Sequence, residues 1–152
     1  MGSERPAILI GVDTEGDDQW SARGRERIEV RNAERLPALQ RLFEAHGARP
    51  TYVVTWEMAT RPESRAILRD LARGGRCEIG AHLHPWSSPP FRPEDLANHT
   101  YPHNLPPELL ERQLTELTQA IESELGVRPT SYRAGRNGFD GRSLPILERL
   151  GY

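Results

Sequence analysis

The sequence predicts an α/β fold with a parallel sheet, built from four strand–helix units. Three observations predict it. Short apolar or β-branched runs have the length and composition of buried strands. Longer segments carry apolar residues at helical spacing. The two patterns alternate four times along the 152 residues, which is typical of a parallel sheet with right-handed crossovers. We expect residues 1–152 to form one domain, either the first part of a larger α/β barrel or a small open sheet.

The four expected strands differ in character. Residues 7–12 (AILIGV) form a continuous apolar run, which is typical of a strand that is buried on both faces. Residues 51–56 (TYVVTW) are β-branched and aromatic, which favours a strand. The remaining two strands are expected over residues 77–83 and 130–134.

The expected helices follow these strands. Residues 32–46 carry apolar side chains at helical spacing, with Asn32 as the N-cap and Gly47 as the stop. Residues 85–107 are proline-rich and aperiodic, which indicates a functional loop. The other helices are expected over residues 62–73, 107–125 and 143–150.

Composition excludes several classes of function. All 20 basic residues are arginine, which excludes a lysine Schiff base and a P-loop. The 22 acidic residues bring the net charge to −2 without blocks of like charge, so we expect no nucleic-acid partner. No apolar run reaches the ~18 residues of a membrane span, and residues 1–6 are too polar for a signal peptide. The single Cys77 excludes an internal disulfide. We expect a soluble, cytoplasmic protein.

Polar residues gather directly after each expected strand. Because ligands of parallel α/β folds bind beyond the carboxyl ends of the strands, we expect these residues to form one site. They are Asp13, Glu15, Asp17 and Asp18 after the first strand, Trp56 and Glu57 at the second, His82 and His84 at the third, and Arg133 and Arg136 after the fourth.

The chemistry of this set points to a metal-assisted hydrolase. Carboxylate and imidazole together are common ligands of zinc and other divalent ions. Residues i and i+2 of a strand point to the same side, so His82 and His84 can face one ion, as can Asp13 and Glu15. A spare carboxylate can serve as the base for an activated water, and a guanidinium can keep it ionised. Each group also has a structural interpretation, as a helix cap, a core side chain or a surface ion pair.

The ordered segments "VDTEGDD", "EIGAHLHPW" and "YRAGRNG" resemble those of the polysaccharide deacetylases, carbohydrate esterase family 4. The resemblance implies a distorted, usually seven-stranded (β/α) barrel that removes N- or O-acetyl groups from sugars with one divalent metal ion, for which we expect zinc. It implies that Asp13 is the catalytic base, Glu15 the metal-ligand acid and His82 a metal ligand. It also implies that Arg133 orients the base.

The sequence departs from the family pattern in three ways, and its "HLHPW" form indicates a divergent branch. The residue four after His82 is Trp86, so His84 has to act as the second imidazole ligand. Thr14 stands beside Asp13 in place of a second aspartate, so Glu15 or Asp17 must serve as the metal-ligand acid. The later motifs of the family would lie beyond the last residue. We therefore expect a C-terminally truncated domain, or a barrel completed by a partner or a second copy, because an open sheet edge needs cover.

Three functions remain open. The first is a metal-dependent deacetylase of an N- or O-acylated sugar or polysaccharide. The second is a related metal amidohydrolase that acts on a small C–N substrate in a closed pocket. The third is a catalytically degenerate domain that binds sugar or a protein partner, with Trp20, Trp56 and Trp86 stacked on sugar rings. Substrate binding is assigned to Asp17, Trp56, Trp86 and Arg136.

Overall fold

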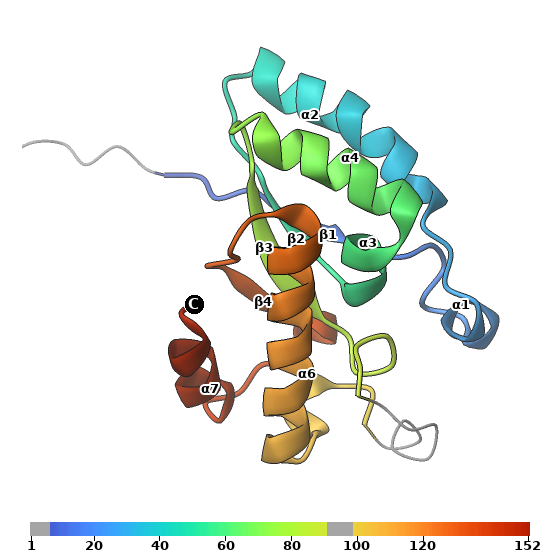
Figure 1. Cartoon of the computed structure of the whole chain (residues 1–152), viewed down its shortest axis with the longest axis vertical. Helices are drawn as coiled ribbons and strands as arrows, with labels where there is room; N and C mark the ends of the chain where they lie inside the picture. Colours follow the sequence, from blue (N-terminus) through green and yellow to red (C-terminus); the bar gives the residue numbers. More distant parts are fainter. Residues whose placement is uncertain (1–6, 91–98) are drawn as a thin grey trace, which may run out of the picture.

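The computed structural model describes residues 7–90 and 99–152 and contains one parallel sheet (Figure 1). Within these residues the strand order is β1-β2-β3-β4, and each strand pairs in parallel with the next one along the chain. Because the order never reverses, the sheet winds in one direction, as in a barrel and unlike a doubly wound sheet. The predicted barrel-type α/β class is confirmed. The strands are β1 (Gly11–Thr14), β2 (Thr51–Val54), β3 (Glu78–Leu83) and β4 (Tyr132–Ala134).

Helices cover one face of this sheet. Figure 1 shows α2 and α4 side by side and α6 running along the sheet. Turns of 3-10 or π-helix extend or connect the α-helices. The α-helices are α1 (Ala22–Glu26), α2 (Leu36–Ala45), α3 (Trp56–Thr60), α4 (Pro62–Arg73), α6 (Pro107–Ala120) and α7 (Ser143–Leu150). The other helical turns are η1 (Arg31–Arg35), η2 (Pro102–Asn104), η3 (Ile121–Leu125) and η4 (Gly135–Asn137).

The two faces of the sheet differ in chemistry because side chains alternate along a strand. The helix-covered face is apolar and joins the hydrophobic core. It contributes Tyr52, Val54, Ile79, Ala81 and Leu83, which pack with helix residues such as Leu68, Leu114 and Ile121. The opposite face carries the polar candidates. Asp13 pairs in register with Val53, and His82 pairs with Arg133.

The first strand lies later than predicted. Residues 7–10 are not in a strand, and the side chains of Ile8 and Leu9 are 85% and 95% exposed. The pairing begins where Thr51 N–H donates to the carbonyl of Ile10. The residue before Thr51 is Pro50, whose carbonyl accepts from the N–H of Glu78 and which has no N–H of its own to extend the ladder between β2 and β3 backwards. The sheet therefore starts at this point.

The helix predictions hold in position and differ at some boundaries. The segment predicted as one helix over 32–46 is a 3-10 turn followed by α2, because Pro37 fits only the first turn of an α-helix. Gly47 follows α2 with a positive φ of 65°, as expected for the stop. The helix predicted over 107–125 is α6 with a π-helical last turn. The short helix α3, directly after β2, was not predicted.

The single cysteine lies at the start of β3. Cys77 is 6% exposed, and its thiol lies 3.5 Å from the carbonyl of Leu71, to which it donates. Burial raises the pKa of this thiol above its ordinary value, so it is protonated at neutral pH. The Cys77 side chain therefore acts as a small core residue.

Two further expectations concern the rest of the chain. The predicted loop over residues 85–107 includes 91–98, which lie outside the described residues, as does the polar segment 1–6. Within the described ranges, no helix is both long and apolar enough to cross a membrane.

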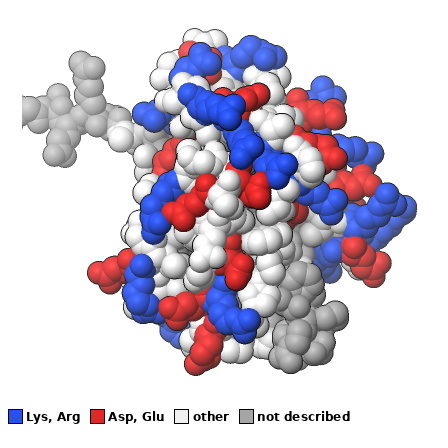
Figure 2. Space-filling view, in the orientation of Figure 1, with Lys and Arg blue, Asp and Glu red and all other residues white. Residues whose placement is uncertain are grey.

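On the face shown in Figure 2, arginine and acidic side chains are interspersed. Several arginines of the described residues form ion pairs, among them Arg65 with Glu124, Arg76 with Glu44 and Arg149 with Glu111.

Candidate metal centre

The candidate site lies at the carboxyl ends of β1, β3 and β4. Asp13 is in β1, and Glu15 follows the last residue of that strand. His82 is in β3, and His84 follows that strand. Arg133 is in β4, where it pairs with His82. Parallel strands end at the same edge of the sheet, so residues from distant parts of the sequence meet there, as predicted.

Glu15, His82 and His84 form a compact cluster. One ligand atom from each lies within 4.8 Å of the other two. Oε2 of Glu15 is 2.6 Å from Nε2 of His84 and 3.5 Å from Nε2 of His82. The imidazole side chains are only 3% and 1% exposed, whereas the carboxylate is 19% exposed. The cluster is thus buried on the imidazole side and open on the carboxylate side.

The hydrogen bond of His82 fixes which ring nitrogen can bind a metal. Its Nδ1 lies 2.8 Å from the backbone carbonyl of Arg133, and a carbonyl can only accept. Nδ1 therefore carries the proton, and in the neutral ring Nε2 directs a lone pair toward Glu15. Metal-binding histidines have this arrangement, with one nitrogen donating to a carbonyl and the other free for the ion.

The three side chains fit a divalent transition-metal ion. Two imidazole nitrogens and one carboxylate oxygen leave a fourth position open, which is the pattern of catalytic zinc sites. Bonds of about 2.0–2.2 Å in a tetrahedral site place ligand atoms roughly 3.3–3.5 Å apart. The 3.5 Å between His82 and Glu15 already matches this spacing. His84 and Glu15, at 2.6 Å, need to separate by less than about 1 Å.

The electrostatics favour the protonation states that metal binding requires. Burial alone would raise the pKa of the Glu15 carboxyl, but the adjacent imidazoles of His82 and His84 lower this pKa to about 2. Burial lowers the pKa of His84, and the hydrogen bond to Glu15 offsets only part of this effect. At neutral pH the carboxylate of Glu15 is thus ionised and the ring of His84 is neutral.

Gly135 lets the chain after β4 pass close to His84. A Cβ added at Gly135 would lie 2.4 Å from the carbonyl oxygen of Leu83 and 2.6 Å from Nδ1 of His84. Both distances are shorter than any van der Waals contact, so this position accepts only glycine. Trp86 packs against His84 with a centroid distance of 4.2 Å. The imidazole of His84 is therefore enclosed between these two residues.

Asp13 and Arg133 form an ion pair beside the metal cluster. Nε of Arg133 lies 3.2 Å from Oδ1 of Asp13, and both side chains are partly exposed. Asp13 does not belong to the cluster of metal-ligand atoms. This is the contact expected of a carboxylate that a guanidinium holds in one orientation.

A cavity of about 150 Å³ connects the cluster with the ion pair. It is smaller than the roughly 300–1,000 Å³ of pockets that enclose a drug-sized ligand. It can hold a small group of a substrate whose remainder lies outside. Trp20, 64% exposed, stands edge-on to His84 at 6.5 Å. The lining residues are Asp13, Glu15, Trp20, His82, His84, Arg133, Ala134, Arg136 and Asn137.

Of the four residues to which substrate binding was assigned, Arg136 is the one that lines this cavity. It donates to the hydroxyls of Thr100 and Tyr101 at 2.8 and 2.9 Å. Its guanidinium carbon also lies 4.1 Å from the centroid of the Tyr101 ring. These contacts hold the guanidinium at one wall of the cavity.

The structure does not bring Asp17, Trp56 and Trp86 to the cavity. Asp17 accepts hydrogen bonds from the backbone N–H groups of Arg31 and Asn32, so it caps the turn η1. Trp56 begins α3 and packs against the hydrophobic core. Trp86 is 5% exposed. Their positions after strand ends could not distinguish these structural contacts from substrate contacts.

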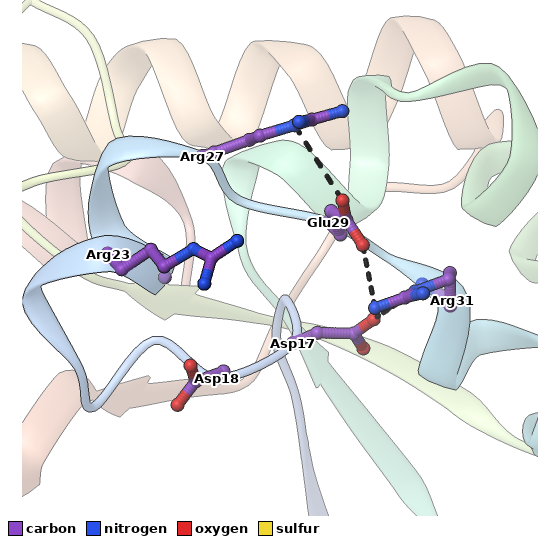
Figure 3. Close-up of a pocket in the computed structure, with 7 residues that line it drawn as sticks. Asp17, Asp18, Arg23, Arg27, Glu29 and Arg31 are labelled. Atoms are coloured by element: carbon purple, nitrogen blue, oxygen red, sulfur yellow. Dashed lines mark hydrogen bonds and ion pairs between the residues drawn. The ribbon is translucent and has the colours of Figure 1, made fainter.

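Asp17 instead lines a second cavity of about 230 Å³, which Figure 3 shows in close-up. Its walls carry charges of both signs. Glu29 lies 2.8 Å from Arg31 and 3.7 Å from Arg27, and Asp17 lies 3.4 Å from Arg31. These charges compensate one another on an exposed surface, where ion pairs contribute little to stability.

The sequence interpretation missed two buried polar residues next to the site, Gln19 and Glu57. Both are almost fully buried, at 1% and 4% exposed. Glu57 was noted as a polar residue after the second strand but received no role, and Gln19 was not considered. No local pattern marks either residue, because their partners other than Thr55 lie 38 or more positions away.

Comparisons with known proteins agree with this fold. A structure from Mycobacterium smegmatis, assigned to the polysaccharide deacetylases, matches 95% of this chain with a TM-score of 0.67 and 19% identity. The Xyl-CE4 domain of a multidomain xylanase from the hindgut metagenome of Trinervitermes trinervoides matches 91%, with a TM-score of 0.57 and 14% identity. A family 4 acetyl xylan esterase from Clostridium thermocellum, in complex with a cobalt ion, matches 91%, with a TM-score of 0.54 and 16% identity.

At these identities the likeness shows a shared fold. The chain spans about half of the length of these structures, since it covers 48%, 52% and 53% of them. A comparison with curated proteins found no match. The sequence model of the family described as polysaccharide deacetylase matches residues 17–152, which is most of the chain. The chain therefore belongs to the polysaccharide deacetylase family.

Proposed function

We propose that this protein hydrolyses the acetyl groups of N- or O-acetylated sugars and uses one divalent metal ion, for which zinc is the expected species. The observation that carries the proposal is the cluster of Glu15, His82 and His84 beside the pair of Asp13 and Arg133. Family membership supports the reaction class. The acetyl xylan esterase among the structural neighbours, with its cobalt ion, supports both the substrate class and the metal.

In this proposal each side chain has a separate task. A divalent ion held by Glu15, His82 and His84 supplies Lewis-acid polarisation and lowers the pKa of water. Asp13 accepts the proton of the water that attacks the acetyl carbonyl carbon. Arg133 orients the carboxylate of Asp13. The bond from the acyl carbon to the sugar nitrogen or oxygen then breaks and releases acetate, and the leaving atom takes up the proton that Asp13 accepted, which restores the base.

The size and openness of the cavity favour this substrate class over a small molecule that is fully enclosed. About 150 Å³ suits an acetyl group while the sugar lies outside. Trp20 stands at the cavity with its ring exposed, in a position to stack on the apolar face of a sugar.

Metal analysis combined with an acetate-release assay tests the proposal. We expect about one divalent ion per chain, and acetate release from acetylated xylo-oligosaccharides or N-acetylglucosamine oligomers. A chelator should abolish the activity, and zinc or cobalt should restore it. Absence of metal binding after addition of zinc, cobalt or nickel would contradict the proposal and favour a non-catalytic sugar-binding domain.

Replacing Trp20 with alanine is expected to raise KM about 3- to 10-fold with little change in kcat, because a stacked aromatic contact contributes about 0.5–1.5 kcal/mol. Metal content should stay unchanged, since Trp20 is not among the ligands. Phe139→Ala is the control, because this ring is also exposed but does not line the cavity. An equal KM for wild type and Trp20→Ala would remove Trp20 from substrate binding.

A further inference from the structure

Glu57 forms a buried hydrogen-bond centre behind the metal cluster. Its Oε1 accepts from the backbone N–H of Gly16 at 3.1 Å and from the hydroxyl of Thr55 at 2.6 Å. The side-chain amide of Gln19 donates to the same oxygen. Glu57 is 4% exposed and does not line the cavity. It therefore touches neither the substrate position nor the ligand atoms.

The first link runs from Glu57 to the carboxylate ligand. Gly16 directly follows Glu15, and its N–H belongs to the peptide bond that joins the two residues. A Cβ at Gly16 would lie 2.3 Å from Ile28 and 2.9 Å from the carbonyl of Glu29, so this backbone is tightly enclosed. The hydrogen bond to Glu57 therefore fixes the orientation of the peptide group next to the Cα atom of Glu15, and with it the direction of the Glu15 side chain.

The second link runs from Glu57 to an imidazole ligand. Oε1 of Gln19 accepts from the indole N–H of Trp86 at 2.8 Å. The indole ring in turn packs on His84 with a centroid distance of 4.2 Å and an interplanar angle of 31°. Glu57, Gln19 and Trp86 thus form a buried chain that ends on the ring of His84.

The second carboxylate oxygen of Glu57 makes this arrangement costly. Among the described residues, Oε2 is buried without a hydrogen-bond partner. A buried carboxylate with an unpartnered oxygen costs free energy that an apolar side chain would avoid. Oε1 of Glu57 accepts hydrogen bonds from the N–H of Gly16, next to Glu15, and from Gln19, whose partner Trp86 packs on His84. These hydrogen bonds give the buried carboxyl group a function at the site.

We propose that Glu57 is a positioning residue that keeps Glu15 and His84 oriented toward a common position for a bound divalent ion. The inference rests on the proposed function of the site. Groups behind a metal site orient its ligands, and their loss typically weakens metal binding 10- to 100-fold. Glu57 would act on two of the three ligands at once.

The test compares cobalt(II) binding by the 152-residue chain in wild type, Glu57→Ala and Glu57→Gln. Affinity is measured by competition with a chromophoric chelator, and the visible absorption of bound cobalt reports the coordination geometry. We expect Glu57→Ala to weaken binding about 10- to 100-fold and to change the cobalt spectrum. Glu57→Gln keeps an acceptor oxygen for Gly16, Thr55 and Gln19, so it should restore affinity to within a few-fold.

Glu78→Ala is the matched control. Glu78 also accepts hydrogen bonds from three groups, the hydroxyls of Thr51, Ser131 and Thr130. It begins β3, about 13 Å along the strand from His82. Its loss should lower the unfolding temperature without changing the cobalt affinity or spectrum. A general loss of stability is thereby separated from a loss of ligand position.

The outcomes distinguish this inference from the function on which it rests. Cobalt binding by Glu57→Ala with wild-type affinity and spectrum overturns the positioning role and leaves the proposed metal site intact. Failure of the wild type to bind cobalt overturns the metal site itself. If Glu57→Ala does not fold, Trp86→Phe replaces it, because phenylalanine keeps an aromatic ring on His84 and removes only the N–H donor to Gln19. An unchanged cobalt spectrum in Trp86→Phe would then overturn the inference.

Discussion

Replacing Asp13 with asparagine is expected to lower kcat about 10²- to 10⁴-fold while metal affinity stays within a few-fold of wild type. Asparagine keeps the shape of the side chain but cannot accept a proton from the attacking water. Asp13 lies outside the group of three ligand atoms, so the ion should still bind. Steady-state acetate release and metal content per chain check the two halves of this expectation.

Asp140→Asn is the control for this experiment. Asp140 also pairs with an arginine, Arg142, at 2.7 Å, but it does not line the cavity. It should keep wild-type kcat. Unchanged turnover in Asp13→Asn would exclude Asp13 as the base, and loss of the metal together with the activity would make it a ligand.

Replacing either His82 or His84 with alanine is expected to weaken divalent-metal binding by more than about 100-fold, beyond the loss typical of groups behind a metal site. Each substitution removes one of the three ligands and leaves the half-buried carboxylate of Glu15 with fewer partners. Isothermal titration with zinc, after removal of metal by a chelator, measures both affinities.

His46→Ala provides the comparison, because this histidine ends the exposed C-terminus of α2. Its affinity for zinc should equal that of the wild type. If only one of the His82 and His84 variants loses affinity, the other imidazole supports the site without binding the ion. This result would also show whether His84 replaces the ligand that the family motif places at the position of Trp86.

The sequence was sufficient to predict the meeting of Asp13, Glu15, His82 and Arg133. Strand alternation and parallel order decide this meeting, and both are visible as patterns in the chain. The role of Trp86 was not predictable in this way. Its position two residues after His84 is compatible with an exposed ring or a buried one. The long-range hydrogen bond to Gln19 decides the outcome.

The different roles of Glu57 and Asp17 could not be predicted from the sequence either. Both are acids at the end of a strand, and nothing in their neighbouring residues distinguishes them. Glu57 is buried because the loop after β1 folds back onto it and offers the N–H of Gly16. Asp17 does not line the cavity at the metal cluster, because its carboxylate accepts from the N–H groups at the start of η1, which have no partner within the helical turn. Contacts between distant segments, which one sequence does not encode as a pattern, assign these two roles.

The buried thiol of Cys77 can be used to follow the opening of β3, the strand that carries His82. Cys77 is the only cysteine of the chain and lies just before β3, so an alkylating reagent can label the protein at one thiol only. Labelling requires β3 and α4 to part, because the side chain is buried between them. An ion bound at the far end of the same strand stabilises the closed state, and the labelling rate therefore records metal occupancy without a substrate.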